Sequence, residues 1–339
     1  MASAPLSVST VLEALPEPTL IVAAGKVALS NSAARSLLGG HIDGGDVRLA
    51  LRHPAAVERL LSDERGTDQV ELVGVGGAEQ RWLMNVSPLP DGSKFVRLTN
   101  RSEWHAAEQM RVDFVANASH ELRTPLATIL GYSETLREQG EAIDPTTRDR
   151  FAGITYEEAR RMQRLVEDLI SLSRIEAERF SVPTETLDLA PLIEEARRNC
   201  GTSASDRGCT IDVDLAPDIP PIIGDRGQIL QTIENLISNA IRYGNPNSPI
   251  WVRAVPERGM VHLSVRDQGE GIAPENIPRV TERFYRVDPS RSRAQGGTGL
   301  GLSIVKHIVE RHRGRLRIAS RVGEGTTVHI LLPAADTMS

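Results

Sequence analysis

The residues best suited to chemistry are adjacent: Ser119, His120 and Glu121 are consecutive, and Thr124 follows one helical turn later. On a helix, His120 and Thr124 would share one face, while Glu121 would point about 100° away and still border the imidazole. A neutral imidazole is a good nucleophile near its ordinary pKa of about 6.5, and a neighbouring carboxylate favours one tautomer. A surface histidine without such a role is the commoner case. The rest of the chain must decide whether His120 accepts a transferred group.

Pro125 belongs to the same expected helix and comes shortly after the histidine. Proline has no N–H to donate to the carbonyl of Glu121, so we expect the helix to bend there. We hypothesise that the activity of the chain is regulated by this bend or by a movement of the C-terminal domain against the helices.

Two asparagines form the first polar signal in the C-terminal third of the chain. Asn235 and Asn239 share one face of a helix expected over residues 227–241, and Arg242 and Tyr243 follow. Amide oxygens placed in this way can hold a cation and face phosphate oxygens. On its own, an asparagine pair on a helix is more often a solvated face.

Glycine-rich segments supply the other signals. Asp267 follows an alternating strand and precedes Gly269 and Gly271. Such a carboxylate can accept a hydrogen bond from an exocyclic amine while the glycine backbone closes on a flat ring. The segment GGTGLGLS at 296–303 leads into a helix whose free N–H groups suit phosphates, and a further glycine turn lies at 323–326.

In their order and spacing, these signals together resemble the sequence boxes of sensor histidine kinases of two-component systems. The H box would be at His120, the N box at 235–243, the G1 box at 267–271, the F box at 282–286 and the G2 box at 297–301. The resemblance covers about residues 105–335, and every box is present.

The resemblance implies the roles of the reactive residues. His120 would attack the γ-phosphate of ATP, and Glu121 would orient and deprotonate the imidazole. Thr124 matches the position that places a water to hydrolyse the partner's phosphoaspartate. Positioning and charge neutralisation are what phosphoryl transfer chiefly requires of a protein.

The resemblance also implies a site for ATP and Mg²⁺. Asn239 would ligate Mg²⁺ with help from Asn235, and Asp267 would bond the adenine amine. A mobile lid would span residues 274–298 and carry Arg286, Arg291 and Arg293. The nucleotide-binding set implied in this way is Asn235, Asn239, Arg242, Tyr243, Asp267, Gly269, Gly271, Arg286, Gly297, Thr298, Gly299, Leu300 and Gly301.

A multidomain α+β protein with three domains is predicted to position these residues. Residues 1–100 resemble a PAS sensor domain with an antiparallel sheet, especially around Asn31. Residues 101–182 form a helical hairpin for dimerisation and phosphotransfer, and residues 183–339 form a catalytic ATP-binding α/β sandwich. The expected strands are 18–23, 26–30, 69–73, 81–86, 94–98, 210–215, 250–255, 261–266, 315–320 and 326–332. The expected helices are 32–38, 101–136, 146–179, 189–199, 227–241 and 301–311.

The hairpin and the length of the chain indicate the partners. Two amphipathic helices leave one apolar face uncovered, and pairing two copies would close a four-helix bundle, so we expect a homodimer. No receiver-like segment remains within the 339 residues, so the acceptor aspartate is expected on the receiver domain of a separate response regulator.

Composition limits the remaining possibilities. The net charge of −6 argues against a nucleic-acid-binding protein. No apolar run long enough to span a membrane and no signal peptide are evident, so we expect a cytoplasmic protein or the cytoplasmic portion of a membrane-anchored kinase. Cys200 and Cys209 are expected to be free thiols, and no earlier cysteine exists for cysteinyl-flavin photochemistry. His41 and His53 are haem ligands only in principle, because solvated histidines are commoner.

Two other interpretations stay open. Gyrase and MutL type ATPases share the ATP-binding fold and use a glutamate to activate water. This chain has Asn235 at that place, which cannot take a proton, and Glu234 would lie about 100° away around the helix. The second alternative is a phosphatase-biased or scaffold signalling module without kinase activity, although no box is degraded.

Overall fold

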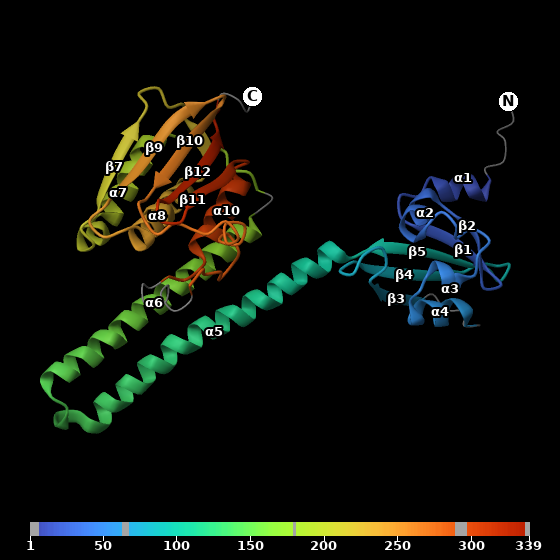
Figure 1. Ribbon diagram of the computed structural model, residues 1–339, viewed down its shortest axis with the longest axis horizontal. Coiled ribbons are helices and arrows are strands. Elements are labelled where there is room, and N and C mark those ends of the chain that lie inside the picture. The colour runs from blue at the N-terminus through green and yellow to red at the C-terminus, as the bar shows by residue number, and fades with distance from the viewer. Residues whose placement is uncertain (1–6, 63–67, 179–180, 289–296, 336–339) are drawn as a thin grey trace. The chain divides into compact units, whose positions relative to one another are not determined.

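The computed structural model describes residues 7–62, 68–178, 181–288 and 297–335 (Figure 1). The chain divides into two compact units, residues 1–115 and 116–339. Helix α5 (Ser102–Gln139) begins in the first unit and ends in the second. The predicted division into three domains therefore stays a prediction. None of the described helices is both long and apolar enough to cross a membrane.

The first unit contains a five-stranded antiparallel sheet with strand order β2-β1-β5-β4-β3. Asn31 ties the sheet to a helix, because its side-chain oxygen accepts hydrogen bonds from the N–H groups of Thr19 and Ala34 at 3.0 and 2.9 Å. The α+β character agrees with the prediction, while the PAS-like assignment stays a prediction. The strands are β1 (Thr19–Ala23), β2 (Lys26–Ser30), β3 (Asp68–Val73), β4 (Arg81–Pro88) and β5 (Lys94–Asn100).

Of the four short helices that the structure describes in this unit, only α2 (Ser32–Leu38) was expected. The other three, of four to eight residues, were not predicted. They are α1 (Val8–Glu13), α3 (Val47–Ala50) and α4 (Pro54–Leu61).

The second unit begins with a helical hairpin. Helix α5 continues without interruption through Pro125, so the proline does not end the helix, and the expected bend stays a prediction. A short 3-10 turn η1 (Gly140–Ala142) leads to α6 (Pro145–Ala177). Asp144 caps α6 by accepting a hydrogen bond from the N–H of Thr147 at 2.9 Å. Figure 1 shows the two helices running back along each other.

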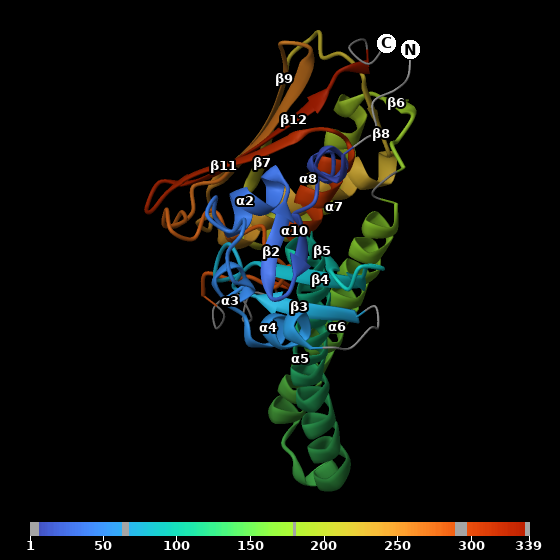
Figure 2. The ribbon, with the colours of Figure 1, turned by 90° about the vertical axis from the view of Figure 1, so that its right-hand side faces the viewer.

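An α/β sandwich completes the second unit. Its five-stranded sheet has the order β11-β12-β10-β9-β7, in which only the β7–β9 pair is parallel. Helices α7, α8 and α10 cover one face of this sheet, and no described helix of the same unit covers the other (Figures 1 and 2). Alternate residues Val261, Leu263 and Val265 of β10 are buried under these helices, as the alternating pattern predicts.

The elements of the sandwich agree closely with expectation. Helix α7 is longer than predicted, and a two-stranded sheet of β6 and β8 was not predicted because each strand has only three residues. Cys200 and Cys209 are buried free thiols, as expected. The elements are β6 (Glu185–Leu187), α7 (Leu189–Asp206), β7 (Thr210–Leu215), β8 (Ile222–Gly224), α8 (Arg226–Tyr243), β9 (Pro249–Glu257), β10 (Met260–Arg266), α10 (Gly301–Arg311), β11 (Arg315–Arg321) and β12 (Gly325–Pro333).

Candidate functional site

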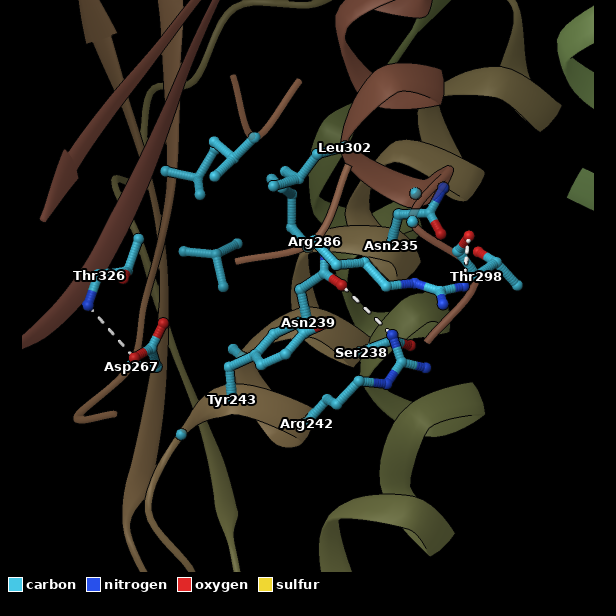
Figure 3. A pocket seen from close by; sticks show the side chains of 18 of the residues that line it. Asn235, Ser238, Asn239, Arg242, Tyr243, Asp267, Arg286, Thr298, Leu302 and Thr326 are labelled. Atoms are coloured by element: carbon cyan, nitrogen blue, oxygen red, sulfur yellow. Dashed lines mark hydrogen bonds between the residues drawn. The ribbon is translucent and has the colours of Figure 1, made fainter. Parts of the chain in front are cut away.

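A cavity of about 590 Å³ lies among α8, the end of β10, the start of α10 and one turn of α6. Figure 3 shows Asp267 and Thr326 on one side of it and Asn235 and Thr298 on the other. Apolar side chains, including Ile272, Leu302 and Val328, line the space between. The predicted residues that line it are Asn235, Asn239, Arg242, Tyr243, Asp267, Gly271, Arg286, Thr298, Gly299 and Gly301.

Asp267 forms one end of this cavity. Its Oδ1 accepts hydrogen bonds from the N–H groups of Gly269 at 2.8 Å and Thr326 at 3.2 Å. The residue is only 8% exposed, and burial raises the pKa of this carboxyl group above its ordinary value, although the two N–H groups act in the opposite direction. A carboxylate fixed in this way leaves its second oxygen able to accept a hydrogen bond from an amine in the cavity.

Two glycines are required by the backbone around the cavity. Gly271 has φ +71°, and a Cβ there would lie 1.9 Å from the carbonyl oxygen of Arg321. Gly299 has φ +74°, and its Cβ would lie 3.0 Å from the backbone of Phe284. A side chain at either position would combine an unfavourable φ with a steric clash. Gly269, Gly297 and Leu300 support these segments but do not line the cavity.

Asn235 and Asn239 project from α8 toward the cavity, on the side of the helix away from the buried Ile233 and Ile237. The amide nitrogen of Asn235 is buried and has no hydrogen-bond partner among the described residues. The oxygen of Asn239 accepts a hydrogen bond of 3.5 Å from Arg242. A Cβ at Gly301 would come within 3.4 Å of the Asn235 oxygen, so glycine lets α10 begin close to this pair.

Two asparagine side chains match the small number of ligands that a protein contributes to a magnesium–nucleotide site. Mg²⁺ in such sites is held by one or two side chains, by waters and by phosphate oxygens. Across the described residues, no group of three His, Cys, Asp or Glu side chains could hold a metal on its own. An amide pair completed by phosphates is therefore the arrangement that the cavity offers.

The start of α10 and Arg286 form the other end of the cavity. The N–H of Leu300 donates to the hydroxyl of Thr298 at 3.3 Å, and Arg286 donates to the carbonyl of Thr298 at 3.0 Å. Free N–H groups and the helix dipole favour an anion at such a helix start, and a guanidinium adds positive charge. This end is suited to phosphates.

His120 and Thr124 do not line the cavity. Both side chains are exposed on α5, and the hydroxyl of Thr124 donates to the carbonyl of His120 at 3.4 Å. The helix thus places them one turn apart, as the sequence predicts. The structure does not bring His120 to the cavity.

Glu121 is held by two arginines from different elements. Arg286 donates to both of its carboxylate oxygens, at 3.3 and 2.9 Å, and Arg161 of α6 donates to Oε2 at 3.3 Å. The Arg286 and Arg161 side chains are 5% and 10% exposed, so water screens these ion pairs little. Glu121 is therefore tied to arginines, with no hydrogen bond to His120 among the described residues.

Sequence reasoning missed Arg161 and the α6 side of the cavity. Arg164, Glu167 and Asp168 line it, and their only signal is that they are charged residues in an amphipathic helix. Thr326 belongs to the expected glycine turn at 323–326, but the hydrogen bond from its backbone N–H to Asp267 was not predicted. Arg291 and Arg293, predicted for the lid, lie outside the described residues.

Comparison with known proteins decides the family. Residues 110–178 match the His Kinase A (phospho-acceptor) domain, and residues 224–336 match the histidine kinase-, DNA gyrase B-, and HSP90-like ATPase domain. The phosphate regulon sensor protein PhoR of Pseudomonas aeruginosa is 37% identical over 300 residues, which cover 88% of this chain and 67% of PhoR. The chain belongs to the sensor histidine kinases.

A second curated relative agrees with this membership, and a solved structure shares the fold. The sensor-like histidine kinase SenX3 of Mycolicibacterium smegmatis is 37% identical to this sensor histidine kinase over 238 residues, covering 70% of this chain and 61% of SenX3. The histidine kinase AdeS of Acinetobacter baumannii has a similar fold, with a TM-score of 0.51, 24% identity, and coverage of 64% of this chain and 98% of AdeS. The chain thus spans about two thirds or less of the two curated relatives.

Proposed function

We propose that the chain transfers the γ-phosphoryl group of ATP to His120 and then to an aspartate of a response regulator. The observation that carries this proposal is the cavity, which has a buried carboxylate at one end and a helix start with Thr298 and Arg286 at the other. Adenine would lie against Asp267 and the phosphates near the start of α10. The family of the chain supports ATP as the phosphoryl donor.

The reaction can be written with the residues of this chain. One imidazole nitrogen of His120 attacks the γ-phosphorus, the bond to the bridging oxygen breaks, and ADP leaves. The proton on the other ring nitrogen passes to Glu121, the adjacent base. Bound through Asn239 and Asn235, Mg²⁺ would neutralise phosphate charge. Because His120 lies outside the cavity in this structure, transfer requires a second placement of the sandwich against the hairpin.

The partners follow from the same proposal. The phosphohistidine would pass its phosphoryl group to the receiver domain of a response regulator. Thr124 would support dephosphorylation of that regulator by positioning the water that hydrolyses its phosphoaspartate. A homodimer is supported by exposed apolar residues on the hairpin, including Leu126, Leu130, Val166 and Ile170. The first unit would act as a PAS-like input domain. The need for ATP supports a cytoplasmic location of the chain.

The alternative of direct ATP hydrolysis has weaker support. Asn235 stands where the gyrase-type carboxylate would be required, and Glu234 accepts a hydrogen bond from Asn199 of α7 at 2.7 Å. A carboxylate engaged in this way is a poor base for a water in the cavity. A phosphatase-biased or scaffold module without kinase activity has the same residues, and it would take no label from γ-labelled ATP.

Incubation with γ-labelled ATP and Mg²⁺ tests the proposal. We expect a label on the protein that is labile in acid and stable in alkali, and we expect His120→Gln to abolish it while nucleotide binding persists. A receiver domain added afterwards should acquire the label. ATP hydrolysis that persists in His120→Gln, with no label on the parent protein, would support the ATPase instead.

A further inference from the structure

Two carboxylates of the hairpin contact the phosphate end of the cavity. Asp168 of α6 accepts a hydrogen bond from the hydroxyl of Thr298 at 2.6 Å. Glu121 of α5 accepts two from Arg286, which itself donates to the carbonyl of Thr298 at 3.0 Å. The groups suited to phosphate oxygens are therefore bound to carboxylate oxygens of the same chain.

The surroundings of Asp168 resemble those of a bound anion. It lines the cavity, and Arg242 and Arg164 lie near enough to favour its charged form. Burial nevertheless dominates and raises the pKa of this carboxyl group. Holding the charge there is thus unfavourable relative to water, which makes the contact with Thr298 displaceable by a more highly charged ligand.

We propose that Asp168 determines nucleotide affinity by occupying the subsite of the terminal ATP phosphate, so that ATP and the docked hairpin compete for Thr298 and Arg286. The inference rests on the proposed function and adds a residue outside the sequence boxes. Phosphate oxygens that engage Arg286 would also release Glu121, because both anions use the same guanidinium. ATP binding would thereby free the base that the transfer requires.

Further contacts hold α6 against the sandwich, and ATP binding would weaken all of them together. Ser171 donates to Gln231 of α8 at 2.8 Å, Arg311 of α10 pairs with Glu178 at 3.2 Å, and Arg283 donates to Glu176. These contacts lie beside the cavity or beyond it, so a measurement of one of them shows whether the hairpin is docked against the sandwich. Loss of the Asp168 contact removes only one of these several attachments. The others allow the hairpin to dock again when ATP leaves, so the competition is reversible.

The first experiment measures nucleotide binding without turnover. Calorimetric titration of Asp168→Ala with a non-hydrolysable ATP analogue and Mg²⁺ should show about tenfold tighter binding than the parent, the factor of one hydrogen bond to a charged group. ADP should gain less and adenosine nothing, since neither carries the terminal phosphate. Glu157→Ala, an exposed carboxylate on α6, is the matched control and should bind all three like the parent.

The second experiment measures docking directly. Cysteines replacing Glu176 and Arg283 should be linked by a short bis-maleimide in the free protein, and the ATP analogue should reduce the yield more than ADP does. The parent protein with its buried Cys200 and Cys209 supplies the background. Asp168→Ala in the double-cysteine protein should lower the yield without nucleotide.

The outcomes separate this inference from the proposed function. Suppose that the analogue binds the parent, that Asp168→Ala gains no affinity, and that the cross-linking yield is the same with and without the ATP analogue. The proposed competition is then overturned, while ATP binding stands. If neither protein binds the analogue, the proposed function itself fails. Equal gains for ATP and adenosine would also overturn the inference, because the effect would then not involve the phosphate subsite.

Discussion

The cavity and the turn of α5 that carries His120, Glu121 and Thr124, here called the acceptor turn for its proposed role, are held in place by different kinds of contact. In the cavity, Asp267 is fixed by backbone N–H groups two residues and 59 residues away, all within one sandwich. At the acceptor turn, His120 and Thr124 are exposed, and among the described residues Glu121 accepts its hydrogen bonds from the side chains of Arg161 and Arg286.

This difference between the two places means that ligand binding and phosphoryl transfer depend on different contacts. The backbone contacts at the Asp267 end of the cavity lie within the sandwich and do not involve the hairpin, whereas the phosphate end is contacted by Asp168 and Glu121 of the hairpin. The contact of Glu121 with Arg286 depends on how the sandwich lies against the hairpin, because Arg286 belongs to the sandwich, whereas the contact with Arg161 lies within the hairpin. The cavity can therefore bind before the reactive residues are assembled, and variants at the two places should fail in different ways.

The largest effect is expected at Glu121. Glu121→Gln keeps the size of the side chain and an oxygen for Arg286, but an amide cannot take the proton of His120. The initial rate of labelling at saturating ATP should fall by about 10²–10³-fold, the usual contribution of a general base, while affinity for the ATP analogue does not decrease.

Glu157→Gln, the exposed carboxylate on α6, should label at the parent rate. If Glu121→Gln labelled within about twofold of the parent, Glu121 would be a docking residue only, and the acceptor turn would need another base.

The sequence predicts the cavity better than any other part because its determinants are local. The strand before Asp267, the helix carrying Asn235 and the glycines before α10 each follow from short patterns whose order matches one family. Periodicity found α8 and α10 to within about two residues because each buries one continuous apolar stripe. The φ values of Gly271 and Gly299 explain why those glycines could not be other residues.

The contacts of the hairpin could not be predicted in the same way. Glu121 and Arg286 are 165 residues apart, and Asp168 and Thr298 are 130 apart, so no spacing in the sequence relates them. Asp168 follows Glu167 in a strongly charged helix, and nothing local distinguishes the two. Both line the cavity, and tertiary packing alone selects Asp168 as the acceptor of the hydrogen bond from Thr298.

A smaller effect, confined to binding, is expected at Asp267. In Asp267→Asn, the amide nitrogen can take the place of the free oxygen, so that a donor would face the donor of the adenine amine. Affinity for ATP and ADP should fall by about a hundredfold, measured by calorimetry. Asp212→Asn, an exposed aspartate on β7, should bind like the parent. Unchanged affinity in Asp267→Asn would show that adenine lies elsewhere.

The smallest effect concerns stability, and it tests whether the cavity is built for its ligand at the expense of the fold. Burial raises the folded-state pKa of Asp267 above the ordinary 3.8, so folding favours the protonated form. This contribution to stability is complete below the ordinary pKa and is lost as the pH rises through the raised folded value. At pH 7 the ionised carboxylate therefore opposes folding.

Asp267→Asn, which carries no charge, should accordingly stabilise the nucleotide-free protein at pH 7 by about 1 kcal/mol or less, and the advantage should shrink as the pH falls toward 4. Urea unfolding of both proteins at several pH values measures it. Excess nucleotide should reverse the order at pH 7, because it stabilises the parent, which binds it more tightly, more than the variant. Lower stability of the variant at every pH would mean that the carboxylate serves the fold through its two backbone bonds, and the cavity would then be no less structural than the rest of the sandwich.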